Sequence, residues 1–228
     1  MDDVFRLRYR VYCEEKGFLP AEDYPQGFET DEFDENAVHF IVYGDDVSPV
    51  GYMRIIDGQD RHGFPMIAHG MTVHDDFEFP PIDGVMEISR MIVRSDYRHE
   101  HRPANDQQSS TDLPLPQAKN ESDLIQFRLL RLMYQHAMRE GAQWICAAME
   151  PTLHRKFRMM GMPFTQIGPS GEYFGEVRPY AMNLREMEAV MENRFPQTMA
   201  FFDSPANDPT SKVVRPGEWK ISALEHAA

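Results

Sequence analysis

The chain has 228 residues, of which 42% are hydrophobic and 26% are charged, an ordinary composition for a globular protein. Its net charge of -14, from 37 acidic and 23 basic residues, disfavours nucleic acid and anionic membranes as partners, because both need a basic surface. No apolar run approaches the roughly eighteen residues of a membrane span, so no stable membrane insertion is expected. An acidic protein partner would need a local basic patch.

The cysteine usage and the start of the chain both indicate a reducing cytoplasm. The first residues are charged and helical in pattern, which argues against a signal peptide. Cys13 and Cys146 are two cysteines in all, too few for a disulfide framework. Cys146 lies in an apolar stretch and is predicted to be a small core residue. His99, Glu100 and His101 lack a third ligand at useful spacing, so no metal site is predicted.

The first half of the chain predicts one helix followed by strands. Residues 2–17 have apolar side chains at roughly helical spacing and end at a glycine. After a loop rich in proline, glycine and acid, residues 38–44 and 49–56 read as a strand pair. Residues 57–84 look irregular, and residues 87–93 predict a further strand.

The second half begins with a polar loop over residues 95–120, long enough to suggest a functional or disordered segment. Alternating patterns then predict, in order, a helix at 120–141, a strand at 144–149, a helix at 151–160, strands at 164–168 and 171–184, and a helix at 184–195.

This order of elements predicts a mixed α/β sheet with at least one parallel crossover. We assign residues 1–200 to a single domain and residues 201–228 to a C-terminal tail.

Four polar residues stand inside predicted strands that ought to be apolar: Arg54 in GYMRII, and Glu87, Ser89 and Arg90 in EISRMIV. Strand alternation would place Glu87 and Ser89 on one face and Arg90 on the other. Buried charges are costly unless they are paired, so the arginines require carboxylates nearby.

The segment ETDEFDENAVHFIV begins with an acidic stretch, which supplies such carboxylates in Asp31, Glu32 and Asp34. We expect this stretch to pack beside the sheet and face its arginines. An alternative is a buried ion-pair network that only positions loops, since such networks also perturb charge states without catalysis.

These segments resemble a known family. LRYRVYCEEKGF, TDEFD, VGYMRI and EISRMIV are similar to the N-acyl-homoserine lactone synthases, which share the fold of the GCN5-related N-acetyltransferases (GNAT). The family's motifs are an arginine and an aromatic residue in the first helix, D-x-x-D, a strand arginine and E-x-x-R. They fall here on Arg8, Tyr12, Asp31, Asp34, Arg54, Glu87 and Arg90, within roughly residues 4–94. The resemblance implies a GNAT-like α/β (α+β) fold, with a mostly antiparallel central sheet flanked by helices.

Two departures affect the implied product. Phe18 stands where the synthases usually carry tryptophan, and the segments EPTLHRKFRMMG and EYFGEVRPYAMNL look closer to two relatives. These are the acyltransferases associated with PEP-CTERM/exosortase systems and the long-chain N-acyl amino acid synthases. The resemblance therefore implies an N-acyltransferase that moves a medium or long acyl chain to the amine of an amino acid-like acceptor. The alternatives are a homoserine-lactone synthase that uses S-adenosylmethionine, and a non-catalytic module that binds lipid or a partner.

The glycine pattern bears on the donor. Acetyl-CoA-using members of the fold hold a pyrophosphate on a glycine-rich turn, but no glycine occurs between Gly84 and Gly141. The resemblance then implies a thioester on acyl carrier protein, with acyl-CoA as the other donor, and no tightly bound cofactor. Carrier protein is acidic and needs a basic landing site. The predicted docking residues, which could equally be solvated helix faces, are Arg128, Arg131, Arg155, Lys156 and Arg158.

The resemblance also implies roles for individual residues. Glu87 would orient or deprotonate the amine, and its neighbouring arginines would keep it ionised. Backbone N–H groups along residues 91–93 would meet the oxyanion, and the apolar faces of residues 144–149 and 124–137 would receive the acyl chain. Asp31 and Asp34 would hold the acceptor's ammonium group or the arginines. The catalytic set is Glu87, Arg90, Ser89 and Arg54, and the remaining substrate-binding residues are Arg8, Tyr12, Phe18, Ile92 and Val93.

Overall fold

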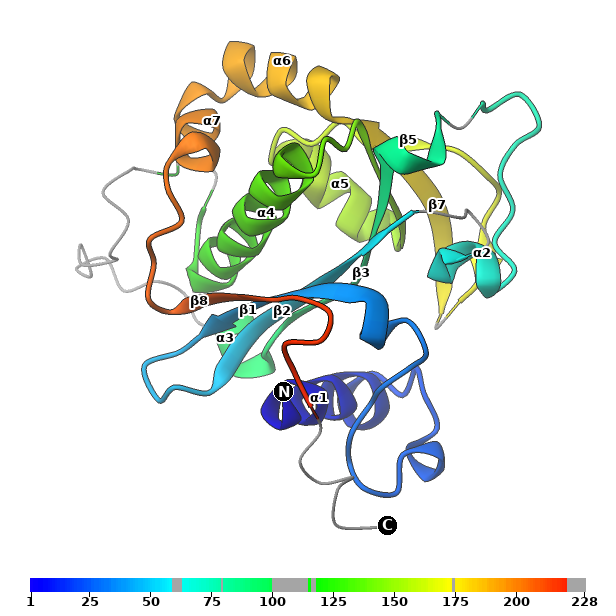
Figure 1. Ribbon diagram of the computed structural model, residues 1–228, viewed down its shortest axis with the longest axis vertical. Helices are drawn as coiled ribbons and strands as arrows, with labels where there is room; N and C mark the ends of the chain where they lie inside the picture. The colour runs from blue at the N-terminus through cyan, green and yellow to red at the C-terminus, as the bar shows by residue number, and fades with distance from the viewer. Residues whose placement is uncertain (59–62, 79, 100–114, 116–117, 174, 221–228) are drawn as a thin grey trace.

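The computed structural model describes residues 1–58, 63–78, 80–99, 115, 118–173 and 175–220. Within these residues a twisted sheet with the order β5-β7-β4-β3-β2-β1-β8 runs through the molecule, and helices cover both of its faces (Figure 1). The strands are β1 (Ala37–Tyr43), β2 (Pro49–Asp57), β3 (Val85–Val93), β4 (Trp144–Met149), β5 (Thr165–Gln166), β6 (Gly171–Glu172), β7 (Glu176–Asn183) and β8 (Ser211–Val214).

The helices alternate with these strands much as the sequence predicts. They are α1 (Asp2–Tyr9), which continues as the π-helical η1 (Arg10–Glu15), then α2 (Pro65–Ala68), α3 (Ser95–His99), α4 (Glu121–Arg139), α5 (Pro151–Met159), α6 (Leu184–Arg194) and α7 (Pro196–Asp203). Short 3-10 turns add η2 (Ala21–Asp23), η3 (Asp34–Asn36) and η5 (Ile82–Gly84). Among the described strands β3 and β4 pair in parallel and the other pairs are antiparallel, so the predicted mixed, mostly antiparallel sheet is confirmed.

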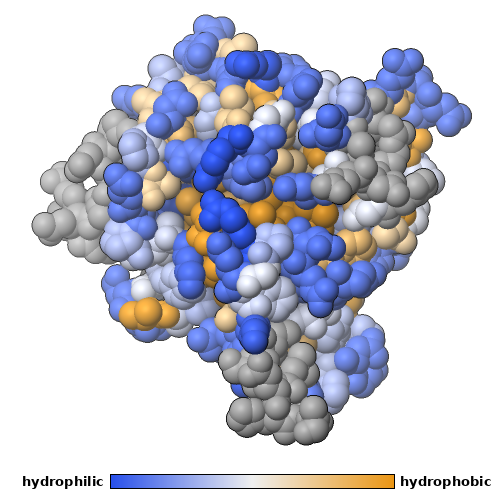
Figure 2. Space-filling model, in the orientation of Figure 1, coloured by the Kyte–Doolittle hydropathy of each residue, from blue (hydrophilic) through white to orange (hydrophobic). Residues whose placement is uncertain are grey.

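Both faces of the sheet are buried, which explains why its strands are apolar on both sides. Val38 and Phe40 of β1 pack in the core beneath α4, while Ile41 of the same strand packs with α1 on the opposite face. The helix α4 begins where the sequence predicts, because the Asn120 side chain accepts a hydrogen bond from the Asp123 N–H at 2.9 Å. Hydrophilic residues cover most of the face shown in Figure 2, and apolar side chains show through in a band near its centre.

The parallel pair separates along its length. β3 and β4 pair over three positions, Val85 with Trp144, Met86 with Ile145 and Glu87 with Cys146. β3 continues to Val93 and β4 to Met149, so the two strands diverge beyond Glu87. This divergence leaves a wedge-shaped gap in the middle of the sheet.

A bulge in β3 overturns the predicted alternation. Tyr52 of β2 pairs with Ile92 whereas Arg54 pairs with Ser89, so β3 has one residue more than β2 across this interval. Arg90 lies in the bulge with φ at 54°, a left-handed conformation that is rare outside glycine. The extra residue turns Arg90 toward the same side as Ser89, where its charge can be paired, rather than to the opposite face.

The segment 201–228, predicted to be a tail, instead begins inside the fold. α7 runs to Asp203, and β8 extends the sheet by pairing with β1 from His39 to Val42. Further on, Trp219 packs against Phe5 and His39, with ring centroids 5.2 and 5.5 Å apart. A four-residue strand with the sequence SKVV is too short to show an alternating pattern, which is why the sequence gives no sign of it.

Two predicted strands and one predicted loop differ in the structure from the prediction. The predicted strand over 171–184 is split into β6 and β7, and that over 164–168 is reduced to β5. Of the predicted loop 95–120, the first residues form α3, and residues 100–114 and 116–117 lie outside the described residues, as does the pair Glu100 and His101. Across the described part of the chain no cluster of metal-ligating side chains occurs, and no helix is both long and apolar enough to cross a membrane.

Gly51 of β2 provides a test of the helix–sheet packing. A Cβ at this position would lie 2.3 Å from Cγ2 of Ile125 and 3.3 Å from Cδ1 of Leu129, both on α4. We expect Gly51→Ala to lower the free energy of unfolding by about 1–3 kcal/mol, because α4 must move to make room. Urea unfolding measures this change, and Gly63→Ala is the control, since its Cβ would meet nothing within 4 Å. Equal stability of the two variants would contradict the close packing of α4.

Candidate active site

Three arginines and three carboxylates form a buried network between α1, the acidic loop, β2 and β3. Arg8 donates from Nε to Glu29 Oε2 and from Nη1 to Asp34 Oδ1, each at 2.5 Å. Arg54 donates from Nη1 to Asp34 Oδ1 at 2.6 Å and from Nη2 to Asp31 Oδ2 at 2.7 Å. Arg90 reaches Glu29 Oε1 and Asp31 Oδ2 from Nη2, both at 3.1 Å. The acidic stretch therefore does face the arginines of the sheet, as predicted.

The membership of this network differs from the prediction in one carboxylate. Glu32 is exposed, whereas Glu29, which lies outside the predicted trio, is fully buried between Arg8 and Arg90. Glu29 is held in place because its N–H donates to the Phe5 carbonyl of α1 at 3.1 Å. Glu29 lies two residues before the D-x-x-D motif, and the sequence carries no signal that separates it from Glu32.

The paired charges keep the carboxylates ionised despite their burial. Burial opposes ionisation of Glu29, but Arg8 and Arg90 outweigh this effect and lower its pKa to about 2. Burial acts in the same way on Asp34, and Arg8 and Arg54 hold the pKa of that carboxyl well below its usual range. Each of the three arginines is therefore matched by carboxylates within the set.

Beside the network, His39 connects the acidic turn to β2. Its Nε2 lies 3.1 Å from the Asp34 carbonyl oxygen and its Nδ1 lies 2.8 Å from the Tyr52 hydroxyl. Burial lowers the pKa of His39 to about 4, so the ring is neutral at pH 7. Its hydrogen bonds therefore position the acidic turn without adding a charge.

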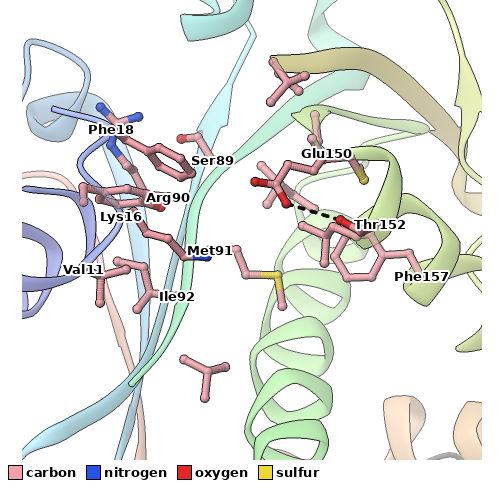
Figure 3. A pocket seen from close by; sticks show the side chains of 18 of the residues that line it. Val11, Lys16, Phe18, Ser89, Arg90, Met91, Ile92, Glu150, Thr152 and Phe157 are labelled. Atoms are coloured by element: carbon pink, nitrogen blue, oxygen red, sulfur yellow. Dashed lines mark hydrogen bonds between the residues drawn. The ribbon is translucent and has the colours of Figure 1, made fainter. Parts of the chain in front are cut away.

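The gap between β3 and β4 opens into a cavity of about 450 Å³, within the usual range for a small-molecule site. Figure 3 shows Phe18, Lys16 and Arg90 on one side of β3, and Glu150, Thr152 and Phe157 across the gap. The predicted site residues that line the cavity are Tyr12, Phe18, Glu87, Ser89, Arg90, Ile92, Val93 and Lys156.

Four predicted site residues lie behind this wall rather than on it: Arg8, Asp31, Asp34 and Arg54. Arg54 donates from Nε to the Ser89 hydroxyl at 2.8 Å, which holds Ser89 at the cavity wall. Asp31 and Asp34 pair with the arginines, and none of these four residues is part of the cavity lining.

Glu87 lines the cavity at the last position where β3 and β4 pair, and it forms no ion pair with the network. It is 1% exposed, and the Met66 N–H at the start of α2 lies 3.1 and 3.2 Å from its two oxygens. Burial raises the pKa of Glu87 to about 8, against the opposing effects of the Met66 N–H and of Arg54. The expectation that nearby arginines keep Glu87 ionised is wrong, because those arginines are already neutralised by Glu29, Asp31 and Asp34.

The cavity lining mixes polar and apolar side chains. Tyr12, Arg90 and Tyr173 are part of its wall, and burial raises the pKa of both phenols to about 12, so both are protonated donors. Across the gap Ala147, Met149, Leu153 and Phe157 are apolar, and Glu150, Thr152 and Lys156 stand beside them. The predicted apolar lining from β4 is thus present, whereas α4 contributes the polar Gln126 and directs its apolar side chains into the core.

The predicted docking residues separate into two groups. Arg155 and Arg158 are exposed on α5, next to the cavity-lining Lys156. Arg131 is buried over the ring of Phe201, with its guanidinium carbon 4.3 Å from the ring centroid, and Arg128 pairs with Asp208 at 3.3 Å. Arg131 therefore cannot meet a partner, and its inclusion is wrong: its position on α4 faces α7, which the sequence cannot show.

The sequence missed several lining residues. Tyr173 comes from the β6–β7 connection and stacks on His69, with ring centroids 4.7 Å apart. Lys16, Arg98 and Glu150 also line the cavity. No motif marks these residues, because they reach the cavity from four separate segments that only the fold brings together.

Part of this chain is similar to a known protein family, and its fold is similar to solved structures. Residues 7–104 match the acetyltransferase (GNAT) domain family, and these residues hold the ion network, the bulge and Glu87. The match covers less than half of the chain. No curated protein sequence matches the chain.

Solved structures share the fold of this chain at low sequence identity. TofI in a ternary complex with an inhibitor and MTA has a TM-score of 0.58 at 18% identity, covering 84% of this chain and 88% of that chain. The CoA-dependent acyl-homoserine lactone synthase BjaI, with SAM and isopentyl-CoA, has a TM-score of 0.56 at 17% identity, covering 99% and 90%. FeeM, an N-acyl amino acid synthase from uncultured soil microbes, has a TM-score of 0.51 at 16% identity, covering 82% and 87%. The predicted GNAT fold and the resemblance to these synthases are confirmed.

The ion network predicts a large cost for removing one arginine. Arg54→Ala leaves Asp31 and Asp34 with too few partners, and we expect the free energy of unfolding to fall by about 3–5 kcal/mol. Arg185→Ala is the control, because this arginine is 82% exposed in its pair with Glu188 and should change stability by less than about 0.5 kcal/mol. Urea unfolding of both variants at pH 7 measures the difference. A small loss for Arg54→Ala would show that the network does not hold the fold together.

Glu87 predicts a pH-dependent stability with a definite sign. Its pKa of about 8 in the folded state lies above the usual value of 4.5, so the folded state binds the extra proton. Below about pH 4.5 this proton stabilises the folded state by its full amount, roughly 4–5 kcal/mol. This stabilisation is lost as the pH rises through 8. Glu87→Gln has no such proton to lose, so we expect the variant to become progressively more stable than the parent between pH 5 and pH 9.

Thermal unfolding across this pH range, with Glu150→Gln as the exposed control, measures the effect. A constant difference between Glu87→Gln and the parent would show that Glu87 has an ordinary pKa.

Proposed function

We propose that this protein transfers a medium or long acyl chain from the thioester of an acyl carrier protein to the amine of an amino acid-like acceptor. The observation that carries this proposal is the position of Glu87: a buried carboxyl with a pKa of about 8 that lines the cavity at the point where β3 and β4 separate. A carboxyl group tuned in this way is suited to accept a proton near neutral pH. The match of residues 7–104 to the acetyltransferase (GNAT) domain family supports acyl transfer.

Glu87 is the base in this proposal. With a pKa of about 8 it is ionised in about one molecule in ten at pH 7, and each ionised molecule has a much higher proton affinity than an ordinary glutamate. The ammonium of the acceptor gives a proton to Glu87, and the neutral nitrogen attacks the thioester carbonyl carbon. A C–N bond forms as the C–S bond breaks, and the attacking nitrogen loses a second proton, which the leaving thiolate takes up to become the free thiol.

The bulge in β3 supports stabilisation of the oxyanion by the backbone. Arg90 and Met91 have no registered partner in β2, and no pairing with β4 extends beyond Glu87. Their peptide groups lie at the cavity wall between Glu87 and the apolar gap. Backbone N–H groups fixed in this place would meet the carbonyl oxygen as its negative charge develops.

The first turn of α4 supports a carrier protein as the donor. Helix N-termini attract phosphates, but this one carries Glu121 and Asp123, and the Asn120 side chain occupies the Asp123 N–H. Asp123 also accepts the Lys119 N–H at 2.9 Å and pairs with Lys156 at 2.8 Å. A pyrophosphate would meet negative charge here, whereas a carrier-protein thioester has no pyrophosphate.

A homoserine-lactone synthase that uses S-adenosylmethionine is the second candidate. Structures of TofI with MTA and of BjaI with SAM share the fold, which favours this candidate. Phe18 lies on the cavity wall beside Tyr12, with ring centroids 6.4 Å apart. The size of its side chain can therefore restrict which acceptor fits the cavity. The product of the reaction separates the two candidates.

Mass spectrometry of lipid extracts from cells that overproduce the protein tests both candidates. We expect an N-acyl amino acid or a related acylated amine, absent when Glu87→Gln is produced instead. An N-acyl homoserine lactone would favour the second candidate, and no acylated amine in either extract would count against both.

With the purified enzyme, Glu87→Gln should lower kcat/KM by roughly 10²–10⁴-fold, the usual contribution of a positioned base. For the parent enzyme kcat/KM should rise with pH and level off above about pH 8, as Glu87 loses its proton. Ser89→Ala keeps Glu87 intact and should retain this pH dependence. If the pH profile of kcat/KM changed equally in Glu87→Gln and Ser89→Ala, Glu87 would not be the base.

A further inference from the structure

The short helix α2 holds the carboxyl group of Glu87 through one backbone group. The Met66 N–H lies 3.1 Å from one oxygen of Glu87 and 3.2 Å from the other, so it donates to the carboxyl group from between them. Within the described part of the chain it is the one hydrogen-bond donor to this carboxyl group. The N–H groups in the first turn of a helix have no acceptor inside the helix. Met66 can therefore donate to Glu87 without breaking a hydrogen bond within α2.

The position of α2 is fixed by Phe64, the residue before it. The Phe64 carbonyl accepts hydrogen bonds from the N–H groups of Ile67 and Ala68, at 3.1 and 2.9 Å, so the turn is built on Phe64. The Phe64 ring is fully buried and lies against Gly58, which directly follows β2. A Cβ at Gly58 would lie 2.2 Å from Cζ of Phe64 and 2.9 Å from the Val85 carbonyl oxygen of β3. The ring therefore fills space that a side chain at Gly58 would occupy, and the end of the sheet sets where α2 lies.

The other end of α2 contacts the cavity wall. His69 directly follows α2 and stacks on Tyr173, which lines the cavity, with 4.7 Å between the ring centroids. The Met66 carbonyl also accepts a hydrogen bond from the Met71 N–H at 2.9 Å. α2 is thus held at both ends, and a shift of α2 away from Glu87 would disturb the packing at both.

Charged and titratable groups on the surrounding elements also act on Glu87. They are Arg54 on β2, Arg90 on β3, Asp31 in the acidic loop, Cys146 on β4 and Tyr173 after β6. The two arginines are paired with the carboxylates of the ion network, and burial raises the pKa of the thiol and of the phenol, so both stay protonated. The Met66 N–H contacts the carboxyl group directly and lowers the pKa of Glu87, against the larger effect of burial.

We infer that α2 is the positioning element of the proposed base: the Met66 N–H holds the Glu87 carboxylate at the cavity wall, and Phe64, packed on Gly58, sets the position of that N–H. The inference rests on the proposed function, in which Glu87 takes a proton from the ammonium of the acceptor. A hydrogen bond to the carboxylate favours its ionised form. The N–H therefore sets the fraction of molecules in which Glu87 can accept a proton near neutral pH. Gly58, Phe64 and Met66 do not line the cavity, so they act through Glu87.

Met66→Pro tests the hydrogen bond, because proline has no N–H and is tolerated in the first turn of a helix. We expect the midpoint of the pH profile of kcat/KM to rise by about one pH unit or more, since a hydrogen bond to a charged group is lost. At pH 7 kcat/KM should fall by about tenfold, and the loss should shrink as the pH rises toward 9. Met66→Leu is the matched control: leucine keeps the N–H and an apolar side chain of similar size, and should keep the midpoint of the parent.

Gly58→Ala tests the support of α2, because its Cβ would displace the Phe64 ring. We expect the midpoint to rise here as well, whereas Gly63→Ala, whose Cβ would meet nothing within 4 Å, should keep the midpoint of the parent. Carbon-13 NMR of protein labelled at the glutamate carboxyl carbon measures the protonation of Glu87 without any catalysis. Glu87→Gln identifies the Glu87 resonance by its absence.

An unchanged or lower NMR midpoint of Glu87 in Met66→Pro would overturn the inference. Should Met66→Pro fail to fold, Gly58→Ala carries the test, and an unchanged midpoint in that variant would overturn the role of Phe64. A higher NMR midpoint with an unchanged pH profile of kcat/KM would show that Glu87 is not the base. That result would refute the proposed chemistry and leave the contact between α2 and Glu87 standing. A pH profile that rises together with the NMR midpoint would support both.

Discussion

The pairing of three buried arginines with three buried carboxylates is the constraint on which the site depends. Each arginine contacts two carboxylates, and the six residues come from α1, the acidic loop, β2 and β3. Removing so many charges from water is tolerable only because the set is complete. Completeness also explains Glu87. Since Arg54 and Arg90 are already neutralised, burial dominates the environment of Glu87 and it retains its proton.

The bulge and the strand divergence act together on β3. The bulge allows Arg90 to join the network on the α1 side, while Met91 and Val93 remain directed to the opposite face. The divergence of β4 beyond Glu87 removes the hydrogen-bonding neighbour of β3 where the bulge occurs. One strand thus anchors the N-terminal half of the molecule and exposes peptide groups to the cavity.

Much of this arrangement is readable from the sequence, and the failures have physical causes. Charged residues inside apolar strands predict a network because buried charges must be paired, and the capped start of α4 is visible in Asn120 and its neighbours. Glu29 was missed because it lies outside the motif that draws attention to Asp31 and Asp34. Arg90 was placed on the wrong face because alternation assumes a regular strand. Arg131 looks like a surface residue because α7, which covers it, packs from more than sixty residues further along the chain. The cavity lining is the least predictable part, since Lys16, Arg98, Glu150 and Tyr173 share no local pattern.

The place of β8 at the edge of the sheet has a consequence for how the chain is synthesised. Until residue 214 has left the ribosome, the outer edge of β1 offers unpaired backbone groups from His39 to Val42, between two buried faces. An exposed apolar edge of this kind invites pairing with other chains. The nascent protein therefore exposes an apolar strand edge in the interval after its ion network can form and before β8 arrives, and a chain cut short before β8 would keep that edge open.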